Sequence, residues 1–177
     1  IGDEVLWSCL TCAACLDACP VEINPVDSIV DMRRFLTLEE ASTPDSAQSA
    51  LQSIEQRGHP WRGTTLTRTS WMEGLDIPTL AEKPESEVLF WVGCSGALVQ
   101  RGVDTTRSMA SVLHKAGIDF AVLGEEETCT GDPARRLGNE YLFQMQAETN
   151  IKTFTQYDVK KIITTCPHCF NTMKNEY

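Results

Sequence analysis

The sequence lacks several features that would assign the protein to common functional classes. No apolar stretch approaches the roughly 18 residues that a transmembrane helix requires, and no stretch has the pattern of a secretory signal. Basic residues are scarce, with 15 Lys and Arg against 25 Asp and Glu, which argues against nucleic acid as a partner. No glycine fingerprint for phosphate follows an apolar run, so we expect this chain to bind neither a flavin nor a nicotinamide. No Ser-His-Asp arrangement is visible, and we name no catalytic residue.

Cysteine, by contrast, is abundant, with eight in 177 residues. Eight cysteines indicate either disulfides or a metal centre. Neighbours as close as Cys9 and Cys12 would close only very small disulfide loops, which stabilise little. Without a secretory signal we expect a reducing compartment, where metal binding is favoured over disulfides.

The first group consists of Cys9, Cys12, Cys15 and Cys19, in the spacing C-x-x-C-x-x-C-x-x-x-C-P that is typical of bacterial ferredoxins. The two-residue gaps let one backbone loop bring three thiolates to a 4Fe–4S cluster, and the fourth cysteine binds the other cluster of a two-cluster protein. We therefore expect the missing ligands of both clusters to come from a second run upstream of Ile1. A zinc site and disulfides are the alternatives for this group.

The chain divides into three segments. Residues 1–40 hold the first cysteine group and then a helix for which Asn24 is a suitable cap. Residues 41–86 are rich in Ser, Thr, Gln and Pro and indicate a connector with one short helix from Pro44 to Arg57. Residues 87–177 form the third segment.

This third segment has the pattern of an α/β fold. Short apolar runs at 88–92, 119–123 and 161–165 are typical of strands in a parallel sheet that is buried on both faces. Two helices are expected between the strands, with Asp104 and Asp132 as their caps. Their expected inner faces comprise Met109, Val112 and Leu113 in the first helix and Leu137, Tyr141, Met145 and Phe154 in the second.

The second group of cysteines, Cys94, Cys129, Cys166 and Cys169, follows these three expected strands. All four therefore lie beyond the carboxyl ends of parallel strands, where open α/β sheets bind their ligands. A single cysteine at a strand end is often just a small buried residue, but four that converge on one edge favour a metal centre. A tetrahedral zinc site is the rival to an iron–sulfur cluster.

Three segments, at 91–94, 129–136 and 165–171, resemble the cysteine-rich CCG domain of heterodisulfide reductase subunits and of the glycolate oxidase iron-sulfur subunit. Together with the ferredoxin run, they are similar to Fe–S oxidoreductases of the kind represented by the D subunit of heterodisulfide reductase. The resemblance implies a Rossmann-like CCG domain for 87–177, preceded by a small α-helical ferredoxin-like unit. It also implies a second CCG domain beyond Tyr177.

One residue departs from the family pattern, since Cys129-Thr130-Gly131 stands where the family has Cys-Cys-Gly. The second of the adjacent cysteines helps to hold the non-cubane cluster that cleaves disulfides in the namesake enzymes. The four remaining thiolates are the complement of a plain cubane. We therefore favour electron relay over disulfide chemistry, with an additional or non-cubane cluster as the alternative.

The resemblance implies an oxidoreductase whose catalytic centre lies in a partner or in regions outside this sequence. We expect an electron-transfer segment between a flavoprotein-type donor and a quinone or disulfide acceptor. A membrane subunit is a further expected partner, so that a cytoplasmic protein would associate with the inner face of the membrane through those other regions. The alternatives are a structural zinc-binding or scaffold protein and a CCG-type disulfide reductase.

A few charged and aromatic residues carry weaker signals. We expect His168 to face solvent at a helix start, the alternative being a residue that tunes the cluster. Arg135 and Arg136 either offset cluster charge or lie on a solvated helix face. The run at 125–127 has the pattern of a solvated acidic loop, or of a docking surface for a basic partner. The tryptophans of the connector, Trp61 and Trp71, are expected to pack on a neighbouring surface.

Overall fold

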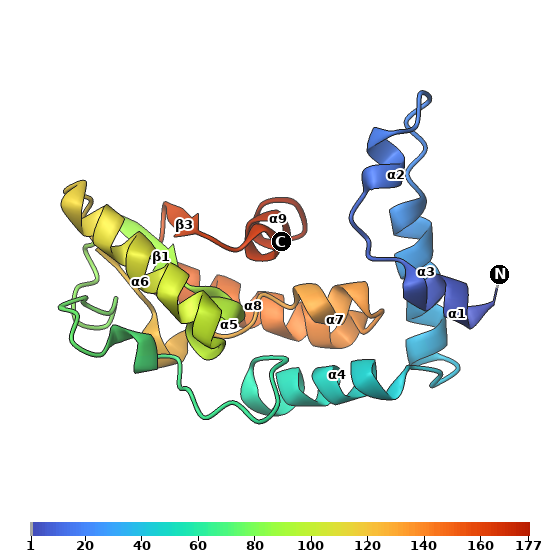
Figure 1. Cartoon of the computed structure of the whole chain (residues 1–177), viewed down its shortest axis with the longest axis horizontal. Helices are drawn as coiled ribbons and strands as arrows, with labels where there is room; N and C mark the ends of the chain where they lie inside the picture. Colours follow the sequence, from blue (N-terminus) through green and yellow to red (C-terminus); the bar gives the residue numbers. More distant parts are fainter. Residues whose placement is uncertain (1) are drawn as a thin grey trace.

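The computed structural model describes residues 2–177. A column of helices at one end of the long axis leads through α4 into an α/β unit (Figure 1). The helices are α1 (Asp3–Ser8), α2 (Ala14–Asp17), α3 (Pro25–Leu38), α4 (Asp45–Arg57), α5 (Gly93–Leu98), α6 (Gln100–Lys115), α7 (Asp132–Arg136), α8 (Glu140–Gln156) and α9 (Pro167–Asn175). The strands are β1 (Val88–Trp91), β2 (Phe120–Ala121) and β3 (Ile162–Thr164), and short 3-10 turns are η1 (Ser70–Met72) and η2 (Gly124–Glu126).

The sheet has the order β2-β1-β3, and both pairs of strands are parallel. Each of the three expected apolar runs contains one strand, so the predicted α/β fold with a parallel sheet is confirmed. Thr79 adds a parallel bridge to Val122 just past the end of β2, and the amide of Leu80 donates to the carbonyl of Val122 across 2.8 Å. The segment before β1 therefore extends the sheet at its β2 edge.

The central strand β1 is buried on both faces because helices cover each side. Val88 and Phe90 pack in a cluster with α6 and with Trp71 of η1. Leu89 and Trp91 pack in a second cluster with residues of α8 and α9. Alternate residues of one strand thus supply two cores, as the pleat of a strand requires.

Residues 3–38 form three short helices beside this α/β unit. Asn24 caps α3 as expected, because its Oδ1 accepts from the amide of Val26 across 3.0 Å, and Pro25 follows at the first helical position. α3 contacts α1, α2 and α7. No helix among residues 2–177 combines the length and apolar character that crossing a membrane would need.

The helix expected in the connector is present as α4 and ends at Gly58, which has a φ of 68°. Leu51 and Ile54 of α4 pack in one buried cluster with Cys94, Cys129 and residues of α7 and α8. The two tryptophans of the segment differ: Trp71 is buried as expected, whereas Trp61 is exposed and that expectation was wrong. The segment thus contributes directly to the packing around the second cysteine group.

The start of the first inter-strand helix was predicted wrongly. α6 begins at Gln100 after the extended residue Val99, so Asp104 lies inside the helix and is not its cap. The corner between α5 and α6 is tight, since a Cβ on Gly102 would lie 1.9 Å from the carbonyl oxygen of Ser95. Met109 and Leu113 pack on the core as expected, but Val112 is 59% exposed.

The single helix expected after Asp132 is in fact two helices, α7 and α8. The break falls at Gly138, whose φ is 81°, and a Cβ there would lie 2.4 Å from the carbonyl of Arg33 in α3. Asn139 then caps α8. Because the break changes the helical phase, Tyr141 and Met145 are exposed, and the residues of α8 that are buried instead are Leu142, Phe143, Ala147 and Asn150.

Candidate metal centres

The structure brings the second group of cysteines together at the carboxyl edge of the sheet. Cys94 is the second residue of α5, shortly after β1, Cys129 lies in the loop between η2 and α7, and Cys166 is the residue before α9. Cys129 hydrogen-bonds to Cys94, and Cys169 hydrogen-bonds to Cys166. Gly93 lies at the junction of the two pairs, because a Cβ on it would be 3.3 Å from the sulfur of Cys169.

Local hydrogen bonds give the two thiols of each pair different pKa values. The bond from Cys169, together with the amides of Cys169 and His168 at the start of α9, lowers the pKa of Cys166 to about 6 despite partial burial. The same bond and burial raise the pKa of Cys169. In the other pair the hydrogen bond from Cys129 lowers the pKa of Cys94 and raises that of Cys129.

Donors other than cysteine also reach these sulfurs. The amide of Gly131, held at a φ of 85°, donates to the sulfur of Cys129 across 3.4 Å. The guanidinium of Arg68 donates to the sulfur of Cys94, also across 3.4 Å. Trp91 packs in the same buried cluster as Cys169, and its indole Nε1 has no hydrogen-bond partner within residues 2–177.

Arg68 and Glu127 were missed as site residues. They form a buried ion pair with 3.0 Å between Nη1 and Oε1. The prediction that the acidic run is a solvated loop was wrong for Glu127, because its carboxylate accepts the amides of Val92 and Gly93. Charged residues in polar segments are usually on the surface, so the sequence offered no signal that either one is buried.

The first group of cysteines surrounds α2. Cys12 and Cys15 are exposed, and Cys9 and Cys19 are partly buried. The amide of Thr11 donates to the sulfur of Cys9 across 3.3 Å, and the amide of Ile23 donates to that of Cys19 across 3.4 Å. Hydrogen bonds from the backbone, that of Ile23 foremost, lower the pKa of Cys19.

No group of three or more His, Cys, Asp or Glu side chains within residues 2–177 has the geometry to hold a single metal ion. All eight cysteines are free thiols.

A network of arginines joins the two cysteine groups. Arg33 of α3 donates to the carbonyls of Leu6, Cys9 and Arg136. Arg136 in turn donates to the carbonyl and hydroxyl oxygens of Thr11. Residues next to the first group are therefore bonded directly to α7, which follows Cys129.

The network continues from α7 to α9. Asp132 was expected to cap its helix, but Gly131 holds the cap position, and the Asp132 carboxylate accepts from Arg136 and Thr172. Its other oxygen lies 3.1 Å from Nδ1 of His168. His168 is largely exposed, as expected, and also makes this contact. Arg135, the neighbour of Arg136, pairs with Glu176 across 2.7 Å, so both arginines have partners within the chain.

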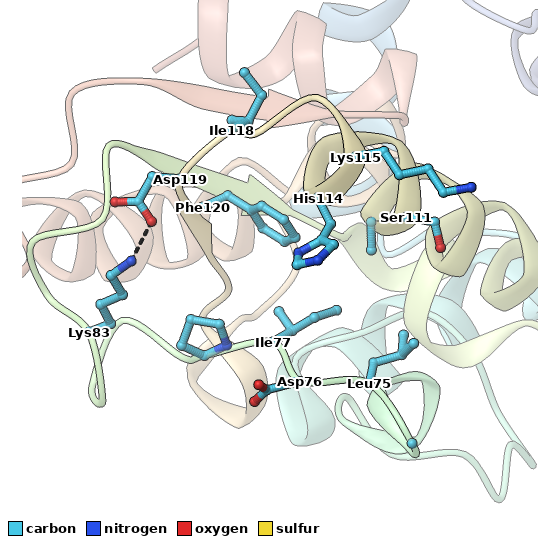
Figure 2. Close-up of a pocket in the computed structure, with 13 residues that line it drawn as sticks. Leu75, Asp76, Ile77, Lys83, Ser111, His114, Lys115, Ile118, Asp119 and Phe120 are labelled. Carbon is cyan, nitrogen blue, oxygen red and sulfur yellow. Dashed lines mark hydrogen bonds and ion pairs between the residues drawn. The ribbon is translucent and has the colours of Figure 1, made fainter.

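A cavity of ≈ 420 Å³ lies at the opposite, amino-terminal edge of the sheet. Figure 2 shows His114 and Phe120 facing this space, with the Lys83–Asp119 ion pair at its margin. Its lining contains no cysteine, so it is separate from both candidate centres.

Residues 88–174 match the family model described as the cysteine-rich domain, CCG. They belong to the cysteine-rich (CCG) domain family. The resemblance proposed for this part of the chain is therefore confirmed, with Cys94, Cys129, Cys166 and Cys169 all inside the matched range.

The whole chain is similar to curated iron–sulfur oxidoreductases. It is 45% identical over 184 residues to the "Probable iron-sulfur-binding oxidoreductase FadF" of Bacillus subtilis, which covers 100% of this chain and 26% of that protein. It is 37% identical over 182 residues to the "EtfAB:quinone oxidoreductase" of Syntrophomonas wolfei, again covering 100% of this chain and 26% of that protein. These names support iron–sulfur binding by this chain and do not favour the zinc scaffold.

The relation to the D subunit of heterodisulfide reductase is also confirmed. The chain is 27% identical over 173 residues to the D subunit of the dihydromethanophenazine:CoB–CoM heterodisulfide reductase of Methanosarcina barkeri, covering 96% of this chain and 41% of that protein. The chain thus spans less than half the length of each of these relatives. No solved structure matches it.

The residues present fit an iron–sulfur cluster at the cysteine-rich domain. The four side chains offered are thiols, the ligands that hold such clusters. An amide and a guanidinium donate to two of these sulfurs, and N–H donors of this kind stabilise anionic sulfur.

Proposed function

We propose that this chain is an electron-transfer segment of an iron–sulfur oxidoreductase, with one 4Fe–4S site at Cys94, Cys129, Cys166 and Cys169. In the ferredoxin-like unit, Cys9, Cys12 and Cys15 would serve one further cluster and Cys19 another, each completed by cysteines outside this sequence. Bound clusters supply reversible one-electron chemistry. The contribution of the chain is to supply thiolates, donate hydrogen bonds to them and exclude water.

The observation that carries this proposal is the chain of hydrogen bonds that connects the two cysteine groups. Residues of the first group bond through Arg33 and Arg136 to α7, and Asp132 of α7 bonds to His168 beside Cys169. Packed and hydrogen-bonded elements hold two redox centres at a fixed separation, which repeated electron transfer between them requires. A loose linker between the two units would let that separation vary.

The names of two relatives support a particular donor and acceptor. We propose a flavoprotein-type donor and a quinone or disulfide acceptor, in keeping with relatives named as an EtfAB:quinone oxidoreductase and as the D subunit of a heterodisulfide reductase. A quinone is apolar and dissolves in the bilayer, so we place the complete protein at the inner face of a membrane, attached by regions outside these 177 residues. Thr130 in place of a second cysteine favours relay over disulfide cleavage at this site.

Iron and acid-labile sulfide analysis of the full-length protein, prepared without oxygen, tests the proposal. We expect a broad absorption near about 400 nm and electron paramagnetic resonance signals from more than one cluster after reduction. Replacing both Cys94 and Cys129 with Ser should remove one signal, and replacing Cys12 with Ser should remove a different one. Stoichiometric zinc without iron, in a colourless protein, would contradict the proposal.

A further inference from the structure

Arg68 lies outside the segment that matches the cysteine-rich domain, yet its guanidinium is part of the cysteine site. It is buried, and its Nη2 donates to the sulfur of Cys94 across 3.4 Å and to the carbonyl of Gly58 across 3.0 Å. Its Nη1 pairs with Glu127 across 3.0 Å. Both ends of this guanidinium are therefore fixed.

Glu127 holds Arg68 in this orientation. One oxygen of its carboxylate accepts the amide of Val92 across 2.9 Å, and the other accepts that of Gly93 across 2.7 Å. The carboxylate is thus locked to the turn that carries Cys94. The ion pair consequently presents its positive end to the sulfur and its negative end to the backbone.

A buried ion pair in this position lowers the stability of the fold relative to well-packed apolar residues, so its presence indicates a role other than stability. Taking two charges out of water costs several kcal/mol per ion, and apolar residues of similar volume would often be as stable. An arginine guanidinium keeps its proton at any physiological pH. Arg68 is therefore a permanent cation against the sulfur of Cys94.

We propose that Arg68 is a positioning residue that sets the reduction potential of the site at Cys94, Cys129, Cys166 and Cys169. This inference rests on the proposed function. When a chemical reductant gives up one electron to the site, the net charge there becomes more negative by one. A cation and a hydrogen bond at the Cys94 sulfur stabilise the reduced state more than the oxidised state, which raises the potential.

The test is a redox titration of the full-length, anaerobically prepared protein, followed by electron paramagnetic resonance. In Arg68→Gln, the equilibrium constant for one-electron reduction of this site should fall at least tenfold, which is a shift of about 59 mV to lower potential. Arg68→Lys should retain part of the wild-type value, because it keeps the charge without the planar fork. Glu127→Gln should shift the potential in the opposite direction, because the cation then lacks its counter-charge.

Arg62→Gln is the matched control, since it removes an exposed arginine from the same segment, where Arg62 bonds only to Gln52 and Ser49 within residues 2–177. It should leave the potential unchanged, and the signal of the ferredoxin-like unit should keep its potential in every variant. If the equilibrium constant for one-electron reduction in Arg68→Gln stayed within threefold of the wild-type value, the inference would be overturned. Loss of iron from this site in both Arg68 variants would also overturn it, because Arg68 would then be a purely structural residue. A wild-type protein without iron would instead refute the proposed function itself.

Discussion

At the scale of single residues, N–H groups donate to sulfur in both cysteine groups, and two of these donors have an unusual backbone conformation. Thr11, whose amide reaches Cys9, and Gly131, whose amide reaches Cys129, both have positive φ. In both cases the left-handed residue directs its N–H toward the cysteine side chain two residues earlier. A residue with a Cβ, such as Thr11, adopts this conformation at a cost in local strain, whereas a glycine such as Gly131 does not.

Gly131→Ala should show this cost. The substitution combines a φ of 85° with a Cβ placed 2.9 Å from the ring of Phe143, so we expect a loss of roughly 2–4 kcal/mol in the free energy of unfolding. Gly117→Ala is the control, because it has a similar φ of 70° but open space around its Cβ, and it should lose only about 1–2 kcal/mol. Anaerobic urea denaturation of both variants measures the difference, and equal losses would show that the contact with Phe143 is unimportant.

The position of the cysteines could be predicted from the sequence, but the burial of the charged residues beside them could not. Spacing alone placed Cys166 and Cys169 at a strand end, because the C-x-x-C pair directly follows an apolar run. Nothing local distinguishes Arg68 from Arg62 or Glu127 from Glu126, since their burial arises only when residues 58–68 fold over the loop after β2. A charge at a site of this kind is visible only after tertiary structure is known.

At the scale of elements, α4 is the part of the middle segment with the clearest structural role. Ile54 is fully buried in the cluster that contains Cys94 and Cys129. The amide of Cys129 also donates to the carbonyl of Gly58, just after the end of α4, across 2.8 Å. α4 and the residue that follows it therefore contact the cysteine site directly.

Ile54→Ala should destabilise the fold by about 2–5 kcal/mol, the usual cost of truncating a fully buried aliphatic side chain. Val112→Ala, on the exposed side of α6, should change the free energy of unfolding by less than about 0.5 kcal/mol. Thermal unfolding of the two variants under the same buffer conditions separates them. If Ile54→Ala were as mild as Val112→Ala, α4 would be a peripheral helix and not part of this core.

The helix boundaries that local capping residues determine were predicted correctly, whereas the boundary that tertiary packing determines was not. Asn24 and Gly58 ended up at the predicted positions because each satisfies backbone groups on its own. The break at Gly138 and Asn139 was overlooked although both residues favour helix ends. Continuing the period of Leu137 through that break placed Tyr141 on the wrong face.

At the scale of the whole molecule, the contact between the helical unit and the α/β unit depends on few side chains. Arg33 is buried, donates to three carbonyls on both sides of the junction and stacks over Trp7 with 5.1 Å from Cζ to the ring centroid. Thr37 donates to the carbonyl of Leu137 across 2.8 Å, and Arg34 pairs with Glu140 across 2.7 Å. Removing Arg33 alone would leave the carbonyls of Leu6, Cys9 and Arg136 without that donor.

Arg33→Met tests this junction, since it keeps much of the side-chain volume and removes every donor. An unsatisfied buried carbonyl costs about 1–3 kcal/mol, and about 1.4 kcal/mol is a factor of ten in an equilibrium. Hydrogen exchange of the amides in α1 and in the loop around Cys9 should therefore accelerate at least tenfold, while the amides of β1 keep their protection. Arg101→Gln, which replaces an exposed arginine on α6, should change the exchange rates neither in α1 and the Cys9 loop nor in β1. Unchanged exchange in α1 would mean that the remaining contacts of α3 suffice to hold the units together, whereas faster exchange in β1 as well would mean that the two units unfold as one.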